Sequence, residues 1–151
     1  MKKYTHKFTV KAPLSAVSEF HRDSRALRML TPPPMWVQFH QVDPLAEGSV
    51  ADFTMWLGPL PVRWTAVHTQ VTPQGFEDTQ QRGPFKFWRH RHTFQELNLG
   101  TTGVVDEIEA EAGNLVSRFM WLTLPILFAY RAWRTRRALR KAGNYAASVE
   151  V

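Results

Sequence analysis

The sequence predicts an α+β domain with an antiparallel sheet and a long C-terminal helix. Residues 3–11 alternate between polar and apolar side chains, short strand-like runs fill residues 35–111, and a helical pattern follows from Asn114 to about Ala142. The chain has 151 residues, of which 44% are hydrophobic, so it can form one sizeable core but not two ordinary domains. We therefore expect a single domain over residues 1–151.

The segment before the meander reads as one strand and two short helices. In YTHKFTVKA, Tyr4 and His6 share one strand face with the apolar residues, and threonines and lysines occupy the other face. Pro13 suits the first position of a helix, and Asp23 can cap a second short helix. The TPPP segment at residues 31–34 ends this helical region.

Six further strands are separated by segments rich in glycine and proline. Their connections are short, which favours an antiparallel meander. In the helical pattern that follows, Pro125 either kinks the helix or begins its second half. The expected strands cover residues 35–43, 49–57, 62–72, 75–82, 85–97 and 101–111.

The stretch WRHRHTF, residues 88–94, places two histidines on one face of a strand. Charge pairing with the last strand favours a register in which Arg91 lies opposite Glu107 and Arg89 opposite Glu109. A one-residue slip would instead move both glutamates beside the histidines, which is less consistent. On the other face, the favoured register pairs Trp88 with Ala110, His90 with Ile108, His92 with Asp106, and Phe94 with Val104.

The composition excludes several classes of site and location. The chain has no cysteine, so it has no disulfide, thiolate metal site or cysteine nucleophile. The N-terminus lacks the apolar run of a signal peptide, and the longest uncharged apolar run, Phe119 to Tyr130, is shorter than the roughly 20 residues of a membrane-spanning helix. We expect a cytoplasmic protein that is not integral to a membrane.

The net charge of +6 is concentrated near the C-terminus. Six of the nineteen lysines and arginines lie between Arg131 and Lys141, and no RNP, zinc-finger or helix-turn-helix pattern accompanies them. We therefore expect no nucleic-acid partner. The predicted helix has one docked face, formed by Phe128, Ala132, Thr135, Leu139 and Ala142, and a basic face opposite to it.

Several short motifs add to this order of elements. They are LTPPP after the two helices, EG before the third strand, F.D.Q..GPF..W.H.H.F from Phe76 to Phe94, and D.I from Asp106 to Ile108. Over essentially the whole chain, the pattern resembles the helix-grip fold of the START/polyketide cyclase (SRPBCC) superfamily. The resemblance implies a curved sheet of about seven strands around the long helix, with an apolar cavity between them. It also implies that the first strand lies beside the last.

The expected function is the binding of a hydrophobic or aromatic small molecule in this cavity, for transport or sequestration. His6, His90, His92 and Asp106 would form a polar cluster that anchors one end of the ligand, because buried polar groups need hydrogen-bond partners. The sequence does not determine on which face of the sheet Trp64 lies, since either arrangement of its hairpin gives acceptable partners. The predicted ligand contacts are His6, Met35, Trp36, Trp56, Trp64, Trp88, His90, His92, Phe94, Asp106, Ile108, Phe119, Leu122 and Phe128.

Two alternatives use the same polar cluster for chemistry. An enzyme resembling cyclases or dehydratases would use His92, oriented by Asp106, as a general acid and base. A metal could be shared by His90 and His92, with His6 or Asp106 as a third ligand. The spacing does not require a metal and the sequence has no cofactor motif, so we expect neither a metal nor a cofactor, whereas the enzyme stays an alternative.

A further alternative is a lipid or quinone carrier that docks on membranes. Aromatic and apolar side chains of the long helix lie on the same side as its arginines, a pattern that favours contact with anionic lipid. The residues of this expected surface are Ile126, Tyr130, Trp133, Arg134 and Arg137.

Overall fold

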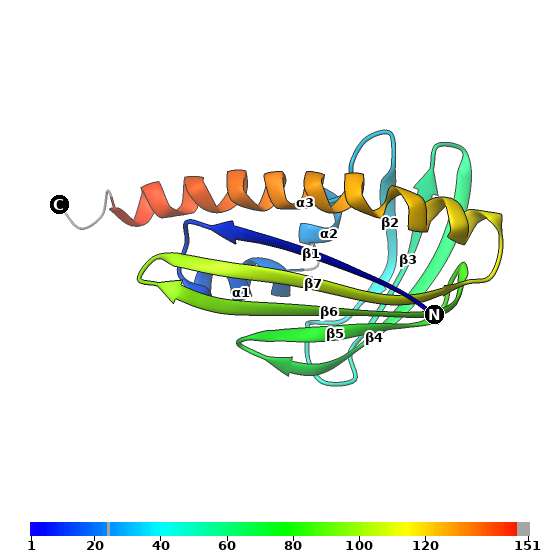
Figure 1. Ribbon diagram of the computed structural model, residues 1–151, viewed down its shortest axis with the longest axis horizontal. Coiled ribbons are helices and arrows are strands. Elements are labelled where there is room, and N and C mark those ends of the chain that lie inside the picture. Colours follow the sequence, from blue (N-terminus) through cyan, green and yellow to red (C-terminus); the bar gives the residue numbers. More distant parts are fainter. Residues whose placement is uncertain (24, 148–151) are drawn as a thin grey trace.

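The computed structural model describes the backbone of residues 1–23 and 25–147 and the side chains as far as residue 140. Seven strands form one antiparallel sheet in the order β1-β7-β6-β5-β4-β3-β2, and one long helix, α3, crosses it (Figure 1). The elements are β1 (Lys2–Val10), α1 (Leu14–Arg22), α2 (Arg25–Met29), β2 (Trp36–Val42), β3 (Val50–Leu57), β4 (Leu60–Thr72), β5 (Gly75–Arg82), β6 (Phe85–Asn98), β7 (Thr101–Ala112) and α3 (Leu115–Ala147).

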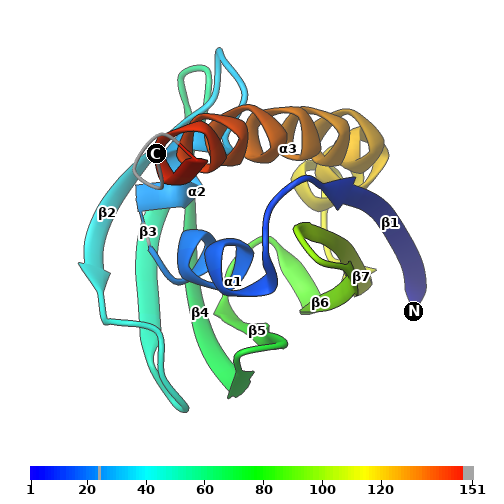
Figure 2. The ribbon, with the colours of Figure 1, turned by 90° about the vertical axis from the view of Figure 1, so that its left-hand side faces the viewer.

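The predicted helix-grip arrangement is confirmed, including the position of β1 beside β7. Figure 2 shows the sheet curving from β2 round to β1, with α3 across its open side and α1 inside the curve. Each predicted strand is present with its ends within two residues of the expected ones. This accuracy follows from the alternation of side chains along the strands and from the glycines and prolines between them.

The helical segments differ in detail from the prediction. Pro13 is the N-cap of α1 and not its first helical residue. Asp23 caps α2 as predicted, because its Oδ1 accepts the backbone N–H of Arg25 at 2.9 Å. Pro125 lies inside α3, so it does not begin a second helix. Within the described residues, no helix is long and apolar enough to span a membrane.

The docked face of α3 is the predicted one. Phe128, Ala132, Thr135 and Leu139 are all buried, whereas the side chain of Ala142 lies outside the described residues. Phe128 belongs to one core cluster with Trp64 and Trp88, and Ala132 and Leu139 belong to a second cluster nearer the other end of the helix. Packing on the sheet therefore orients α3 and selects which of its side chains face inward.

The predicted register between β6 and β7 is confirmed, with Arg91 opposite Glu107 and Arg89 opposite Glu109. Arg89 forms an ion pair with Glu109. Although these two residues lie opposite each other, the expected ion pair of Arg91 with Glu107 is wrong. Arg91 instead forms an ion pair with the buried Glu77 of β5, at 2.6 Å. Strand β6 has a neighbour on each side, and the prediction considered only one of them.

Candidate ligand-binding site

A cavity of about 620 Å³ lies between the concave side of the sheet and α3. Its walls are mostly apolar: strands β2 to β6 contribute Phe39, Phe53, Met55, Trp64 and Trp88 among others, and α3 contributes Leu124 and Phe128. The size lies within the range of small-molecule sites, roughly 300–1,000 Å³. The space is therefore large enough for a small hydrophobic ligand.

One wall of the cavity is polar, and the strand register explains why. Asp78 of β5 pairs with His90 of β6, and His92 pairs with Asp106 of β7. Because side chains two apart on a strand share a face, both histidines and both aspartates point to the concave side. Three of these four residues, Asp78, His90 and His92, line the cavity, and Asp106 lies behind them.

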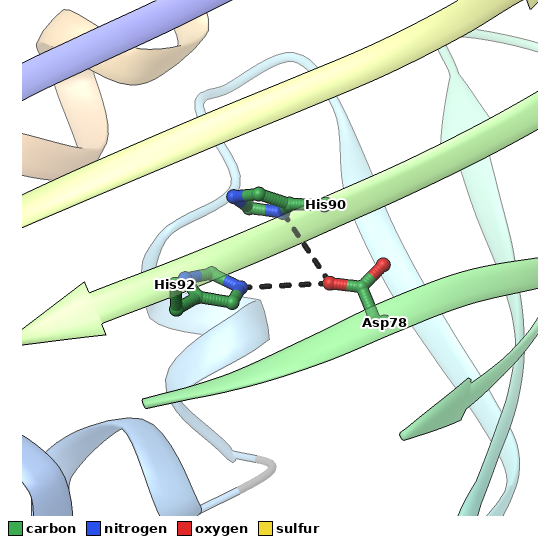
Figure 3. A group of neighbouring side chains, drawn as sticks. All are labelled: Asp78, His90 and His92. Atoms are coloured by element: carbon green, nitrogen blue, oxygen red, sulfur yellow. Dashed lines mark ion pairs between the residues drawn. The ribbon is translucent and has the colours of Figure 1, made fainter. Parts of the chain in front are cut away.

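Each imidazole of this polar wall lies between two carboxylates. His90 donates a hydrogen bond from Nε2 to Oδ1 of Asp106 at 3.0 Å, and its Nδ1 lies 3.3 Å from Oδ2 of Asp78. The Nδ1 of His92 lies 2.9 Å from the same oxygen of Asp106, and its Nε2 lies 3.5 Å from Oδ2 of Asp78 (Figure 3). The contact of His92 with Asp106 is close but is not a directed hydrogen bond, since within the described chain this Nδ1 has no correctly oriented partner.

The charges in this cluster are strongly coupled. Burial alone would lower the pKa of His90, but its hydrogen bond to Asp106 and the nearby Asp78 raise that pKa to about 9. Burial alone would raise the pKa of both aspartates, but the imidazoles of His90 and His92 lower each pKa well below its usual range. At neutral pH, His90 is therefore protonated and both carboxylates are ionised.

Arg131 of α3 reaches the same cavity. Burial lowers the pKa of this guanidinium, and the charges of Asp106 and Asp78 oppose that effect. An arginine remains protonated in proteins, so Arg131 and His90 together balance the two carboxylates. The guanidinium lies 5.2 Å from the ring of Phe128, and its buried Nε has no hydrogen-bond partner among the described residues.

His21 adds a neutral imidazole to the wall. Its ring Nδ1 donates to the carbonyl of Val17 at 2.8 Å, which leaves Nε2 as an acceptor. Burial, followed by the charge of the neighbouring His92, lowers the pKa of His21 to about 4. The cavity therefore offers a guanidinium donor and an imidazole acceptor as well as the histidine and aspartate cluster.

The predicted ligand contacts fall into three groups: some line the cavity, some lie on the outside of the molecule, and some lie behind the cavity wall. Those that line the cavity are Met35, Trp64, Trp88, His90, His92, Phe119 and Phe128. Trp64, whose face the sequence left open, points inward and meets Trp88 edge to face with ring centroids 5.4 Å apart. The aromatic part of the expected site is thus assembled by neighbouring strands.

Three of the predicted contacts lie on the outside. Trp36 and Trp56 are a cross-strand pair on the convex face, stacked with their centroids 5.4 Å apart, and Trp36 is 51% exposed. Their strands turn Phe39, Phe53 and Met55 inward instead. Leu122 is 75% exposed on the outer side of α3. The prediction relied on aromatic and apolar character, which does not determine the face of a strand or helix on which a side chain lies.

Four more predicted contacts lie behind the cavity wall. Phe94 and Ile108 are plain core residues, and Asp106 contacts the two histidines from beneath. His6 lies opposite Asp106 on β1, as expected, but it packs against the rings of Phe8 and Phe128 outside the cavity lining. These residues support the wall and do not line it.

Sequence reasoning missed Asp78, His21 and Arg131. Asp78 has the same parity as Phe76 on a strand that pairs with the histidine strand, so the second pairing of that strand could have revealed it. Arg131 follows Phe128 by three residues, a helical spacing that was hidden within the basic run. His21 follows the buried Val17 by four residues on α1.

Comparisons with known proteins give structural matches only. No family model matches the chain, and no curated protein does. Solved structures are similar over most of their length. They include protein CV1439 from Chromobacterium violaceum (TM-score 0.75, 12% identity, 92% of this chain and 98% of that one), Zhui aromatase/cyclase from Streptomyces sp. R1128 (0.71, 15%, 93% and 94%), and TTHA0849 from Thermus thermophilus (0.67, 15%, 91% and 99%). Identities this low show a common fold alone.

Proposed function

Because this chain shares the helix-grip fold of the START/polyketide cyclase (SRPBCC) superfamily, we propose that it acts as one domain that binds a hydrophobic small molecule with a polar end. The observation that carries the proposal is the cavity of about 620 Å³ with aromatic walls and one charged wall. The apolar part of the ligand would pack on Trp64, Trp88 and Phe53. Its polar group would meet His92 and Arg131.

The polar wall supports a specific orientation of the ligand. Arg131 has a buried Nε that lacks a partner in the described part of the chain, and such a donor costs free energy until an acceptor arrives. Ligand pockets commonly combine apolar walls with a few converging polar groups of this kind. A ligand oxygen near Arg131 would satisfy the donor while its hydrocarbon part fills the rest of the cavity.

The binding proposal is tested by filling the cavity. Ala66 of β4 points into it, and the next residue, Val67, faces the other side of the sheet. We expect Ala66→Leu to weaken binding of an apolar fluorescent probe, or of a molecule co-purified and identified by mass spectrometry, at least tenfold. Val67→Leu is the matched control and should leave binding unchanged. Equal affinity of Ala66→Leu and the wild type would contradict binding in this cavity.

A second candidate function is proton-transfer catalysis of the cyclase or dehydratase type. His92 lines the cavity, and its Nδ1 lies 2.9 Å from Asp106, so a carboxylate is close to the imidazole that would transfer the proton. One of the similar structures is an aromatase/cyclase. Incubation with the identified ligand separates the two functions, since an enzyme gives product over many turnovers, whereas a binding protein holds one equivalent unchanged.

The exposed surface of α3 favours a third candidate, a carrier that docks on membranes. Ile126 is 71% exposed and also borders the cavity, so an exposed apolar side chain adjoins the cavity. Nearby, Tyr130 packs on Trp133, and Arg134 and Arg137 lie over the Trp133 ring. Liposome co-sedimentation should increase with anionic lipid and should decrease in an Arg137→Gln variant. Binding that ignores lipid charge would count against this function.

A further inference from the structure

We propose that Asp78, His90 and His92 form a binding site for a divalent transition-metal ion at the polar end of the cavity. Oδ2 of Asp78 lies 3.3 Å from Nδ1 of His90 and 3.5 Å from Nε2 of His92, and one ligand atom from each residue lies within 4.8 Å of the others. Two ligand atoms of a tetrahedral zinc site, with bonds of roughly 2.0–2.1 Å, are about 3.3 Å apart. The observed spacing therefore matches an edge of that tetrahedron.

The directions of the three side chains also suit a metal. Neither contact with Asp78 has the alignment of a hydrogen bond, although every residue concerned is described, and the single directed hydrogen bond of His90 goes to Asp106. Figure 3 shows both imidazoles turned toward the same oxygen of Asp78. Potential ligand atoms that lie this close together without forming hydrogen bonds to one another leave room for an ion between them.

Asp106 supplies the outer layer that metal-binding histidines need. It lies 3.0 Å from Nε2 of His90 and 2.9 Å from Nδ1 of His92, the two nitrogens that are not turned toward Asp78. A carboxylate behind a ligating imidazole fixes the ring and its tautomer. Asp106 therefore backs both histidines, through a hydrogen bond to His90 and a close contact with His92, whereas sequence reasoning placed Asp106 itself among the possible ligands.

The ligand set and the charges indicate what the site would hold. Two imidazoles and one carboxylate suit zinc and neighbouring first-row ions. Three protein ligands leave a fourth position, which would face the cavity that these residues line. Arg131 opposes a second cation, but the charges of Asp78 and Asp106 outweigh it. The inference does not depend on the proposed hydrophobic ligand.

The test is a zinc titration of the full chain, prepared without a histidine tag and stripped with a chelator. We expect one Zn²⁺ per chain by calorimetry, and tetrahedral absorption bands when Co²⁺ replaces it. Asp106→Asn should weaken zinc binding about 10–100-fold, the range for outer-layer partners, and Asp78→Asn and His92→Gln should weaken it more. His40→Gln is the matched control, because His40 bonds to Thr54 away from the cluster, and it should bind zinc as the wild type does.

Two outcomes would overturn the metal site. One is the absence of any wild-type binding tighter than about 1 mM. The other is equal zinc affinity in the wild type and both ligand variants, with thermal unfolding used to confirm that Asp78→Asn and His92→Gln are folded. Binding of an apolar probe, measured with a chelator present, reports on the cavity separately, so failure of the metal site and failure of the proposed function are distinguishable.

Discussion

The shifted pKa of His90 predicts a specific pH dependence of stability in the metal-free protein. The pKa is raised from 6.5 to about 9 by the fold. Because the folded state holds this proton more tightly than the unfolded chain does, the stabilisation is fully present below pH 6.5 and is lost as pH rises through 9. At 1.36 kcal/mol per pKa unit, the full contribution is about 3 kcal/mol, and most of it should disappear between pH 7 and 10.

The assay is urea unfolding from pH 6 to 10.5 with a chelator present, comparing the wild type with His90→Gln. Other groups that titrate in this interval are common to both proteins, so the difference between the two pH curves isolates His90. His68→Gln is the control, because His68 bonds to Ser49 outside the cluster, and it should keep the wild-type slope. Asp78→Asn should reduce the slope, since Asp78 helps to raise the pKa. Parallel curves for the wild type and His90→Gln would refute the reasoning.

Three further predictions concern packing, ion pairs and metal. Phe128→Ala should lower the free energy of unfolding, measured by the same urea assay, by about 3–5 kcal/mol, since Phe128 is only 1% exposed. Phe119 is exposed, so Phe119→Ala should lower the free energy of unfolding by less than about 1 kcal/mol. Arg91→Met should lower the free energy of unfolding by about 2 kcal/mol, because it leaves the buried carboxylate of Glu77 without its ion-pair partner. Lys3→Met, which removes an exposed ion pair, should lower it by less than about 1 kcal/mol. Similar losses in the two variants would contradict the importance of burial. Zinc at 100 times its dissociation constant should stabilise the wild type by about 2.7 kcal/mol and Asp78→Asn much less, as measured by thermal unfolding.

The fold was largely predictable because the strands obey a local rule. Alternation along Tyr4 to Val10 and charge matching of Arg89 with Glu109 depend only on neighbouring residues and on one short loop. The same rule placed His90 and His92 inside. Parity alone could not place Trp36 and Trp56, because both faces of an edge hairpin can carry aromatic residues, and here they stack on the convex side.

The complete polar wall could not be predicted from local patterns, because it joins five separate elements. Asp78 belongs to β5, the second strand that pairs with the histidine strand β6. His21 belongs to α1, a short helix that lies inside the curve of the sheet. Arg131 belongs to a basic run in which Arg136, Arg137 and Arg140 are exposed, and the packing of Phe128 and Ala132 turns Arg131 toward the cavity. These contacts are set by tertiary structure, and periodicity gives only half of the cluster.

A metal ion bound at the proposed site should change the ligand charge that the cavity prefers. Without a metal, the positive charges of His90 and Arg131 balance the carboxylates of Asp78 and Asp106, which favours a neutral polar group. A divalent ion that replaces the His90 proton adds one positive charge to the wall, which favours an anionic group. A matched pair of probes, 2-naphthoate and 2-naphthalenemethanol, tests this reasoning. Zinc should increase the affinity of the carboxylate relative to the alcohol at least tenfold in the wild type and should have no such effect in Asp78→Asn. An unchanged ratio in the wild type would mean that the ion and the ligand do not share this wall.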